Sequence, residues 1–166
     1  MDYLNLDKKK TENTVKGLNV LLADYHVYYQ KLRNFHWNIV GKNFFDLHEK
    51  FENMYNDAKV KIDDIAERIL TLRYQPISNL SEYLKVSNIS ESNSDCTDVE
   101  MVETLLKDHG ILLKQMRKVV DCASLDEDEG TIDLIGAYIR ELEKTSWMLD
   151  AWIMNTGDNK QKVKMK

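Results

Sequence analysis

The sequence predicts an all-α protein, a bundle of four long helices with one long crossover connection. The chain has 166 residues but only one proline and six glycines, and 43% of its residues are hydrophobic while 31% are charged. Apolar residues recur at steps of three and four over four long stretches, as on the buried face of an amphipathic helix. Short links join the first two and the last two stretches, and a long link joins the middle pair, which is the connectivity of a bundle with a crossover.

The first helix is expected from about Thr11 to Ile39, because its apolar residues from Leu18 to Phe35 keep helical spacing. Gly41 is a natural terminator for this helix. The pattern resumes at Phe44 and continues to Leu72. Because the link is so short, we expect these two helices to be antiparallel neighbours.

Pro76 ends the second helix, and the segment 78–86 is expected to hold a short helix with Ser78 as its cap. Residues 87–97 are polar and are expected to form a loop. A third long helix then begins near Val99 and fades at Ala123. The acidic residues 126–129 are expected to open the fourth, where negative side chains suit the positive end of the helix dipole, and Gly157 to end it.

These elements define one helical domain of residues 11–157 between two flexible tails, 1–10 and 158–166. Both tails contain lysines, but the chain as a whole carries a net charge of −5 with pI near 5.4. That balance argues against a folded surface built as a nucleic-acid platform and fits cation uptake better. Cys96 and Cys122 form no CxxC pattern and follow no signal peptide, so we expect a reduced cytoplasmic setting. No apolar run approaches the roughly 20 residues of a membrane span.

Two histidines lie symmetrically about the predicted turn between the first two helices. His36 and His48 are each six residues from Lys42, so in an antiparallel hairpin they are expected at the same height, where they could share a metal. Glu52 is four residues beyond His48, and Glu67 is four beyond Asp63, a spacing that stacks side chains on successive turns. At about 100° of rotation per residue, these three carboxylates fall within about 100° of His48 on one broad face.

One chain cannot gather all five residues around one ion. His48 and Asp63 are fifteen residues apart, and a rise of about 1.5 Å per residue separates them by roughly 22 Å. If this helix meets its twin antiparallel across a two-fold axis near residues 57 and 58, position 48 faces 67 and position 52 faces 63. A two-fold contact then makes two equivalent sites, so the sequence predicts a dimer.

Two imidazoles and three carboxylates suit Fe(II), with Zn(II), Co(II) and Mn(II) as competitors. None of the four histidines follows a glutamate by three residues, so the Glu-x-x-His motif of bundle-core di-iron sites is missing, and the site is not expected inside one bundle. The alternative interpretation is that the histidines are ordinary boundary residues and the carboxylates a solvated face. The shared helical phase, the hairpin pairing and the two-fold pairing argue against that alternative.

The stretch that carries these residues, NFHWNIVGKNFFDLHEKFENMYNDAKVKIDDIAERI, closely resembles the metal motif of the Dps proteins (DNA-binding proteins from starved cells), or mini-ferritins. The resemblance continues through QPISNLSEYL, DEDEGTIDLI and EKTSWMLDAW, so it covers nearly the whole chain. It implies a ferritin-like four-helix bundle and a ferroxidase site between two subunits, holding two irons. The matching ligand positions are His36, His48, Glu52, Asp63 and Glu67. Position 52 is often Asp in the family, so Glu52 is a modest departure that affects the second metal position.

The resemblance also implies a hollow shell of twelve subunits in the bacterial cytoplasm, with nucleoid association as an alternative. Such a shell oxidises Fe(II), preferably with hydrogen peroxide, and stores ferric oxyhydroxide. Trp37 matches a family tryptophan near the site, as packing or as an electron donor. The acidic segment with Asp126 resembles the lining of three-fold iron-entry pores, and Asp128, Glu129 and Asp133 match best. The alternative role of these carboxylates is to complement the helix dipole.

Two other functions stay open at this stage. The lysine-rich tails suggest a DNA-binding protein whose many identical tails act together and whose affinity falls with salt. A non-catalytic shell with an adhesive or immune-activating role is the second alternative, because a fold does not fix a function. The remaining histidines, His26 and His109, lie on or beside apolar stripes and are expected to be packing or second-site residues.

Overall fold

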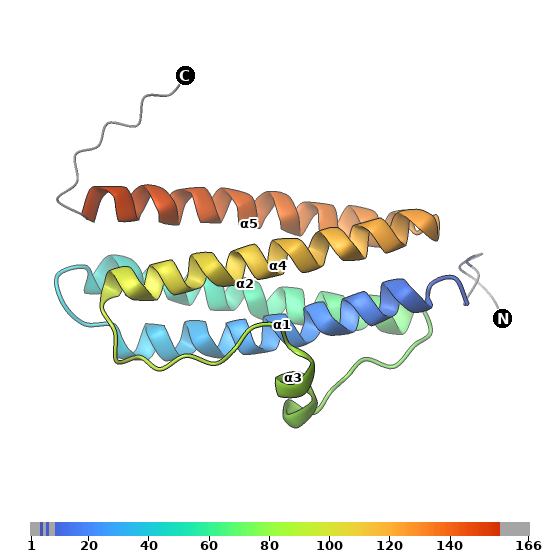
Figure 1. Cartoon of the computed structure of the whole chain (residues 1–166), viewed down its shortest axis with the longest axis horizontal. Helices are drawn as coiled ribbons and strands as arrows, with labels where there is room; N and C mark the ends of the chain where they lie inside the picture. Colours follow the sequence, from blue (N-terminus) through green and yellow to red (C-terminus); the bar gives the residue numbers. More distant parts are fainter. Residues whose placement is uncertain (1–3, 5, 7–8, 157–166) are drawn as a thin grey trace, which may run out of the picture.

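A computed structural model describes residues 4, 6 and 9–156, and it confirms the predicted all-α fold. Four long helices run alongside one another: α1 (Glu12–Asn38), α2 (Phe44–Thr71), α4 (Asp98–Leu125) and α5 (Glu129–Thr156). The short helix α3 (Leu80–Val86) lies beside the bundle, within the connection that returns from the end of α2 to the start of α4 (Figure 1). The described residues contain no strand.

The predicted helix bounds are close to those observed, with three differences. The α3 cap is Asn79 rather than Ser78, because the Asn79 carbonyl accepts the first helical hydrogen bond, from the Tyr83 N–H at 3.1 Å. Helix α4 continues past Ala123 to Leu125. Asp126 is the C-cap residue of α4 and does not open α5, which begins at Glu129.

Some predictions fall outside the described residues. Gly157, the C-terminal tail 158–166 and most of the N-terminal tail 1–10 are among them, so the division into one domain and two tails stays a prediction. Within the described part of the chain, no helix combines the length and the apolar character needed to cross a bilayer.

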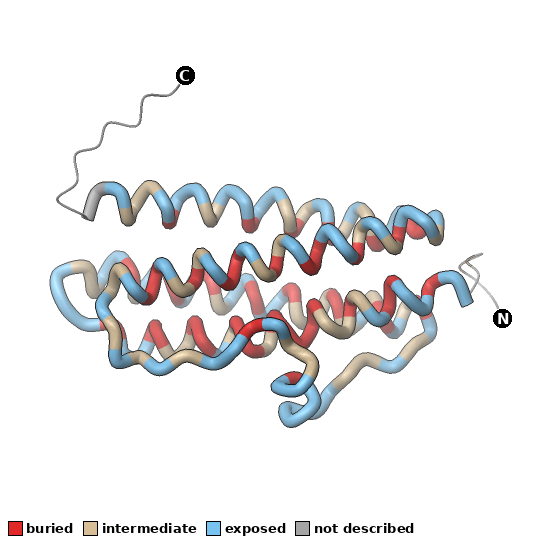
Figure 2. Tube along the Cα trace, in the orientation of Figure 1, coloured by how far each residue is buried: buried red, intermediate tan, exposed pale blue. Residues whose placement is uncertain are grey.

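The core lies between the long helices, and Figure 2 shows their buried positions turned toward one another. Helix α1 packs against α2 and α4, and α4 packs against α5. Leu18, Phe35, Phe51 and Leu105 have no exposed surface, and the rings of Phe35 and Phe51 lie 6.1 Å apart between α1 and α2. Side chains at three- and four-residue spacing thus bury one face of each helix, which is the main stabilising contribution to such a bundle.

The turn between α1 and α2 places the two helices for the site described below. Gly41 has φ of +103°, in the left-handed region that glycine adopts without steric cost. Its carbonyl accepts a hydrogen bond from the Phe44 N–H at 3.2 Å, at the start of α2. The Asn43 side chain then donates to Asp98 at 2.6 Å, so the turn is also tied to the start of α4.

The long connection between α2 and α4 is anchored on α1. Asp24 of α1 is fully buried and accepts hydrogen bonds from the Asn88 N–H at 2.6 Å and the Ser87 hydroxyl at 2.9 Å. Further along, the Asn34 side chain donates to the Ser92 carbonyl at 2.8 Å. These contacts hold the crossover on the outside of α1.

Candidate metal centre

His36 and His48 face each other across the α1–α2 hairpin, which confirms their predicted proximity. Their rings stack with centroids 3.8 Å apart. Nδ1 of His36 lies 2.8 Å from the His48 carbonyl, and Nδ1 of His48 lies 2.9 Å from the His36 carbonyl. Because a carbonyl oxygen only accepts, each Nδ1 carries the proton and donates it. A neutral ring with a protonated Nδ1 has its lone pair on Nε2, so both histidines are held in the tautomer that binds metal through Nε2.

Two further aromatic rings hold this pair in place. Phe44 stacks on the outer side of the His48 ring, with centroids 4.8 Å apart. Tyr55 meets the His36 ring edge-on, with centroids 5.3 Å apart. His36 is 8% exposed and His48 is half-buried, so both rings are fixed by packing as well as by hydrogen bonds.

Glu52 is linked to the histidines through Tyr55. It is exposed on α2, and the Tyr55 hydroxyl donates to it at 3.3 Å. Tyr55 thus contacts both His36 and Glu52, but among the described residues the two histidines and this carboxylate do not form a metal-binding group within one chain. Tyr55 is a residue that the sequence analysis missed, although its position seven residues after His48 gives it the same helical face.

Asp63 and Glu67 are exposed on the later turns of α2, away from the histidines. Among the described residues of a single chain, no group of three or more His, Cys, Asp or Glu side chains is close enough together to hold a metal ion. The fold therefore brings His36 and His48 into contact but does not bring Asp63 and Glu67 to them. That a second copy supplies these two carboxylates stays a prediction.

Trp37 lies outside the histidine pair, on the surface of the chain. Its side chain is 58% exposed, and the Arg33 guanidinium lies over its ring, 4.6 Å from the centroid. The same guanidinium lies 5.3 Å from the Tyr29 ring. Within one chain Trp37 is thus a surface residue with a cation on one face, and its predicted role as packing or electron donor stays a prediction.

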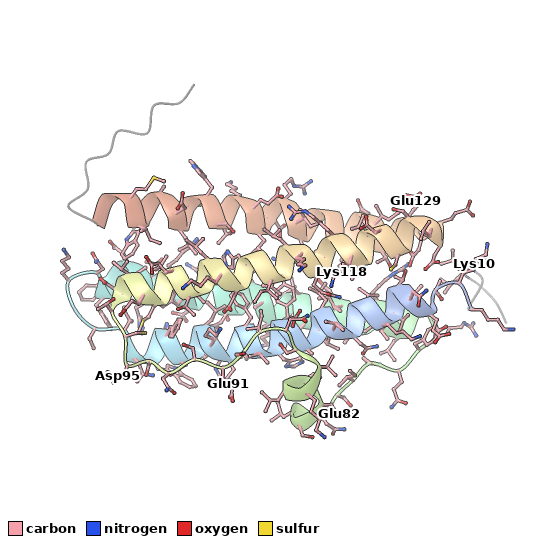
Figure 3. All side chains as sticks on the ribbon, in the orientation of Figure 1. Lys10, Glu82, Glu91, Asp95, Lys118 and Glu129 are labelled. Carbon is pink, nitrogen blue, oxygen red and sulfur yellow. The ribbon has the colours of Figure 1, made fainter. Side chains whose placement is uncertain are left out.

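The predicted pore residues surround the start of α5, where Figure 3 shows Glu129 at the end of the bundle. Asp128 is 1% exposed and caps α5, because its Oδ1 accepts from the Thr131 N–H at 3.1 Å. It also forms an ion pair with Arg68 of α2. Glu129 and Asp133 are exposed. These two carboxylates are free to face solvent, whereas Asp128 is held inside the chain, and the pore role of all three stays a prediction.

The other two histidines have different environments. His26 is half-buried and stacks on Tyr83 with centroids 3.9 Å apart. Both ring nitrogens of His109 are engaged, with the Ser146 Oγ at 2.8 Å and the Tyr28 hydroxyl at 2.7 Å. Because the Ser146 hydroxyl donates to the Leu142 carbonyl, His109 donates to Ser146 and accepts from Tyr28. Burial lowers the pKa of His109 to about 3, so the ring is neutral and has no free nitrogen for a metal.

Comparison with known proteins shows the family to which the chain belongs. The family model of the ferritin-like domain matches residues 15–157. The chain is 41% identical over 142 residues to the DNA protection during starvation protein 2 of Bacillus anthracis, and the match covers 86% of this chain and 97% of that protein.

Solved structures point to the same family as this relative. The fold matches a Dps protein from Vibrio cholerae O1 with a TM-score of 0.89 and 43% sequence identity, over 92% of this chain and 96% of that one. That protein is described as a member of a broad superfamily of ferritin-like diiron-carboxylate proteins. A Dps protein from Bacillus brevis matches with a TM-score of 0.85 and 38% identity, over 87% and 97% of the two chains. The chain therefore belongs to the ferritin-like family and, within that family, to the Dps proteins.

Proposed function

We propose that this protein is a ferroxidase and an iron store, with Fe(II) as its substrate and hydrogen peroxide as the preferred oxidant. The observation that carries the proposal is the reciprocal hydrogen bonding of His36 and His48, which uses Nδ1 of each stacked ring and leaves each Nε2 available as a ligand. An Nδ1–H bonded to a carbonyl is the arrangement expected of a metal-binding imidazole. A core histidine such as His109, in contrast, uses both nitrogens within the fold.

The complete site is proposed to span two copies of the chain. His36, His48 and Glu52 of one copy face Asp63 and Glu67 of the other across a two-fold axis, and two such sites form per dimer. Imidazole nitrogens with carboxylate oxygens suit Fe(II), and Zn(II), Co(II) and Mn(II) are expected to compete. The exposure of Glu52, Asp63 and Glu67 supports this proposal, because ligands shared with another chain must be accessible in each chain alone.

For oxidation at such a site, the protein mainly has to hold two Fe(II) ions close together and to supply negatively charged ligands. Two neighbouring Fe(II) ions each give one electron to hydrogen peroxide, which takes up two protons and leaves as two waters. Because both electrons arrive together, no hydroxyl radical is released. The carboxylates then stabilise the higher charge of the Fe(III) product. Ferric oxyhydroxide is proposed to collect inside a hollow shell of twelve subunits in the bacterial cytoplasm, with Glu129 and Asp133 at the iron-entry pores.

The test measures peroxide consumption by anaerobically Fe(II)-loaded protein. We expect about one peroxide per two Fe(II), as the electron balance requires, and loss of this rapid reaction in the double variant His48→Ala with Asp63→Ala. Asp46→Ala is a matched control, because Asp46 is an exposed carboxylate in the first turn of α2 and no predicted ligand. A rate in the double variant equal to that of the parent protein would defeat the site assignment.

DNA binding is a second proposed function, supported by the similarity to the DNA protection during starvation protein 2 of Bacillus anthracis. The lysines that would carry it lie mainly at positions 160, 162, 164 and 166, outside the described residues. Since the chain has a net charge of −5, binding should be weak and fall steeply with salt. A gel-shift titration at low salt, comparing the full chain with one lacking residues 158–166, decides it: equal retardation by both proteins would contradict binding through this tail.

A further inference from the structure

Three polar contacts join α2 to α5 along a single stripe. The α2 residues Lys61, Asp64 and Arg68 follow one another at steps of three and four, so they lie on the same side of the helix. Their partners on α5 and its cap come in the reverse order along the chain, as expected for antiparallel helices. We call these contacts the α2–α5 seam, and it consists of Lys61 with Glu141, Asp64 with Tyr138, and Arg68 with Asp128 and Thr131.

The contact of Arg68 is the most enclosed of the three. Its guanidinium pairs with Asp128 and donates through Nε to the Thr131 Oγ1 at 2.9 Å. The Thr131 hydroxyl in turn donates to Asp128 at 2.6 Å, so Arg68, Asp128 and Thr131 are each bonded to the other two. The Arg68 side chain is only 17% exposed and that of Asp128 only 1%. The planar guanidinium lies so close to Gly130 that a Cβ there would come within 3.0 Å of it.

The other two seam contacts involve Lys61 and Asp64, which lie on the turns of α2 before Arg68. The Tyr138 hydroxyl donates to Asp64 at 2.8 Å, and burial, reinforced by Asp64, raises the Tyr138 pKa, so the phenol remains a donor at neutral pH. The buried Lys61 ammonium lies 3.0 Å from the Glu141 carboxylate. Together the three contacts restrain the rotation of α2 and its height relative to α5, in addition to the packing of α2 on α1.

The seam lies directly beside the carboxylate half of the proposed site. Asp63 precedes Asp64, and Glu67 precedes Arg68, so each predicted ligand is one residue from a seam residue and about 100° around the helix from it. Neighbouring residues of one helix move together as a rigid unit. The seam contacts therefore influence the direction in which Asp63 and Glu67 point.

We propose that Arg68 is a positioning residue for the metal site, which aligns Asp63 and Glu67 by clasping the Asp128 cap of α5. This inference rests on the proposed function, because it assigns a role in holding the same metal ligands. Arg68 touches neither metal nor substrate. It acts through the helix it belongs to, and it ties that helix to the segment that carries Glu129 and Asp133. The Arg68–Asp128 ion pair thus links the helix that carries the proposed oxidation ligands to the segment that carries the proposed iron-entry carboxylates.

The experiment measures Co(II) binding to the assembled protein, with Co(II) alone as the probe, by the intensity and shape of its d–d absorption bands. Arg68→Met keeps the apolar stem but removes the fork of donors, and we expect Co(II) affinity to fall about tenfold, at the lower end of what loss of an outer contact costs a metal site. Arg68→Lys restores the charge without the planar fork, so its affinity should be intermediate. Tyr138→Phe removes one seam hydrogen bond at nearly constant volume and should weaken Co(II) binding about threefold.

The matched control is Arg117→Met, which removes an exposed pair with Glu143 that joins α4 to α5 and should leave Co(II) binding unchanged. Size-exclusion chromatography confirms assembly of each variant; if Arg68→Met fails to assemble, Arg68→Lys and Tyr138→Phe decide. Parent-like affinity and band shape in all assembled seam variants would overturn the inference, since a purely structural role lowers stability without changing the metal environment. Asp63→Asn separates the two proposals: unchanged Co(II) binding in that variant defeats the proposed site itself.

Discussion

At the scale of single residues, the protein uses histidine in two opposite ways. His36 and His48 each donate from Nδ1 to a backbone carbonyl, and no hydrogen bond of the described residues occupies their Nε2 atoms. His109 uses both nitrogens within the bundle, where it connects Tyr28 to Ser146. The difference lies in whether the fold leaves one nitrogen without a protein partner, and that cannot be deduced from the residue type.

Buried His109 should make the stability of the protein depend on pH. The pKa of the His109 side chain is 6.5 in the unfolded chain and about 3 in the folded protein. Between these values the unfolded state binds more protons, so this stabilisation is complete above pH 6.5 and is lost as the pH falls toward 3. Going from pH 6.5 to 4.5 should cost about 2 to 3 kcal/mol per subunit from this group. Urea unfolding midpoints at the two pH values measure the loss.

The comparison with His109→Gln isolates this contribution. Glutamine cannot become charged, so the variant should lose less stability on acidification than the parent, whatever its stability at pH 7. Asp24 and Asp108 act in the opposite direction, because burial raises the pKa of both carboxyls. They are the same in both proteins and cancel in the comparison. An equal loss in parent and variant would contradict a neutral buried His109.

At the scale of elements, the tight turn between α4 and α5 is constrained by its backbone conformation and by a side-chain contact from α2. Glu127 has φ of +57°, in the left-handed region, which lets the Asp128 N–H bond to the Ala123 carbonyl at 2.9 Å. This closure ends α4 and places Asp128 as the cap of α5. Beyond that cap, Arg68 of α2 holds the turn from the side.

Glycine at position 127 should stabilise the protein. The left-handed conformation is unfavourable for a residue with a Cβ and free of that cost for glycine, so Glu127→Gly should raise the free energy of unfolding by up to about 1 kcal/mol. The thermal or urea midpoint of unfolding measures this change. Glu103→Gly is the matched control, since Glu103 is exposed in the interior of α4, where glycine should destabilise by a similar amount. A lower midpoint for Glu127→Gly would contradict the observed turn.

The elements were largely predictable from the sequence, and the contacts between them were not. Helical periodicity, Gly41 and Pro76 placed the long helices within a few residues, and the symmetric spacing about Lys42 placed His36 against His48. These signals are local, because they need only the geometry of one helix or one turn. The pairing of Arg68 with Asp128 joins residues sixty positions apart, and no periodicity in either helix reports it. The hydrogen bonds between each histidine ring and the other residue's carbonyl could not be predicted either, because they depend on the path of the backbone through the turn.

At the scale of the whole molecule, the described residues form their own core without bringing the predicted ligands together. The described residues bury a continuous core, yet they gather no set of three metal ligands. The carboxylates that the sequence pairs with the histidines lie on a later part of α2, at exposed positions. The proposed ferroxidase therefore depends on the predicted pairing of two copies of the chain.

Mixing two inactive variants should restore oxidation. His48→Ala lacks the histidine half and Asp63→Ala lacks the carboxylate half, so neither variant alone has an intact site. If the site spans a two-fold interface, a mixed dimer has one site with both halves intact and one with both impaired. Random co-assembly should then recover about a quarter of the parent sites.

Peroxide-dependent Fe(II) oxidation after co-refolding of equal amounts measures this recovery. The control is the two variants assembled separately and mixed afterwards, which should stay inactive. No recovery after co-assembly, with mixed oligomers confirmed by mass, would contradict a shared site.

The position of the histidine pair also determines when each half of the proposed site can form. His36 and His48 are only twelve residues apart and meet across a tight turn, so the loop entropy lost in joining them is small. This half of the site can form as soon as a hairpin does, while the rest of the chain is still being synthesised. In the proposed two-copy site, the carboxylate half would depend instead on the concentration of finished subunits. A newly made chain would then offer a metal ion only two nitrogen ligands, and the full predicted ligand set would form only after two copies meet.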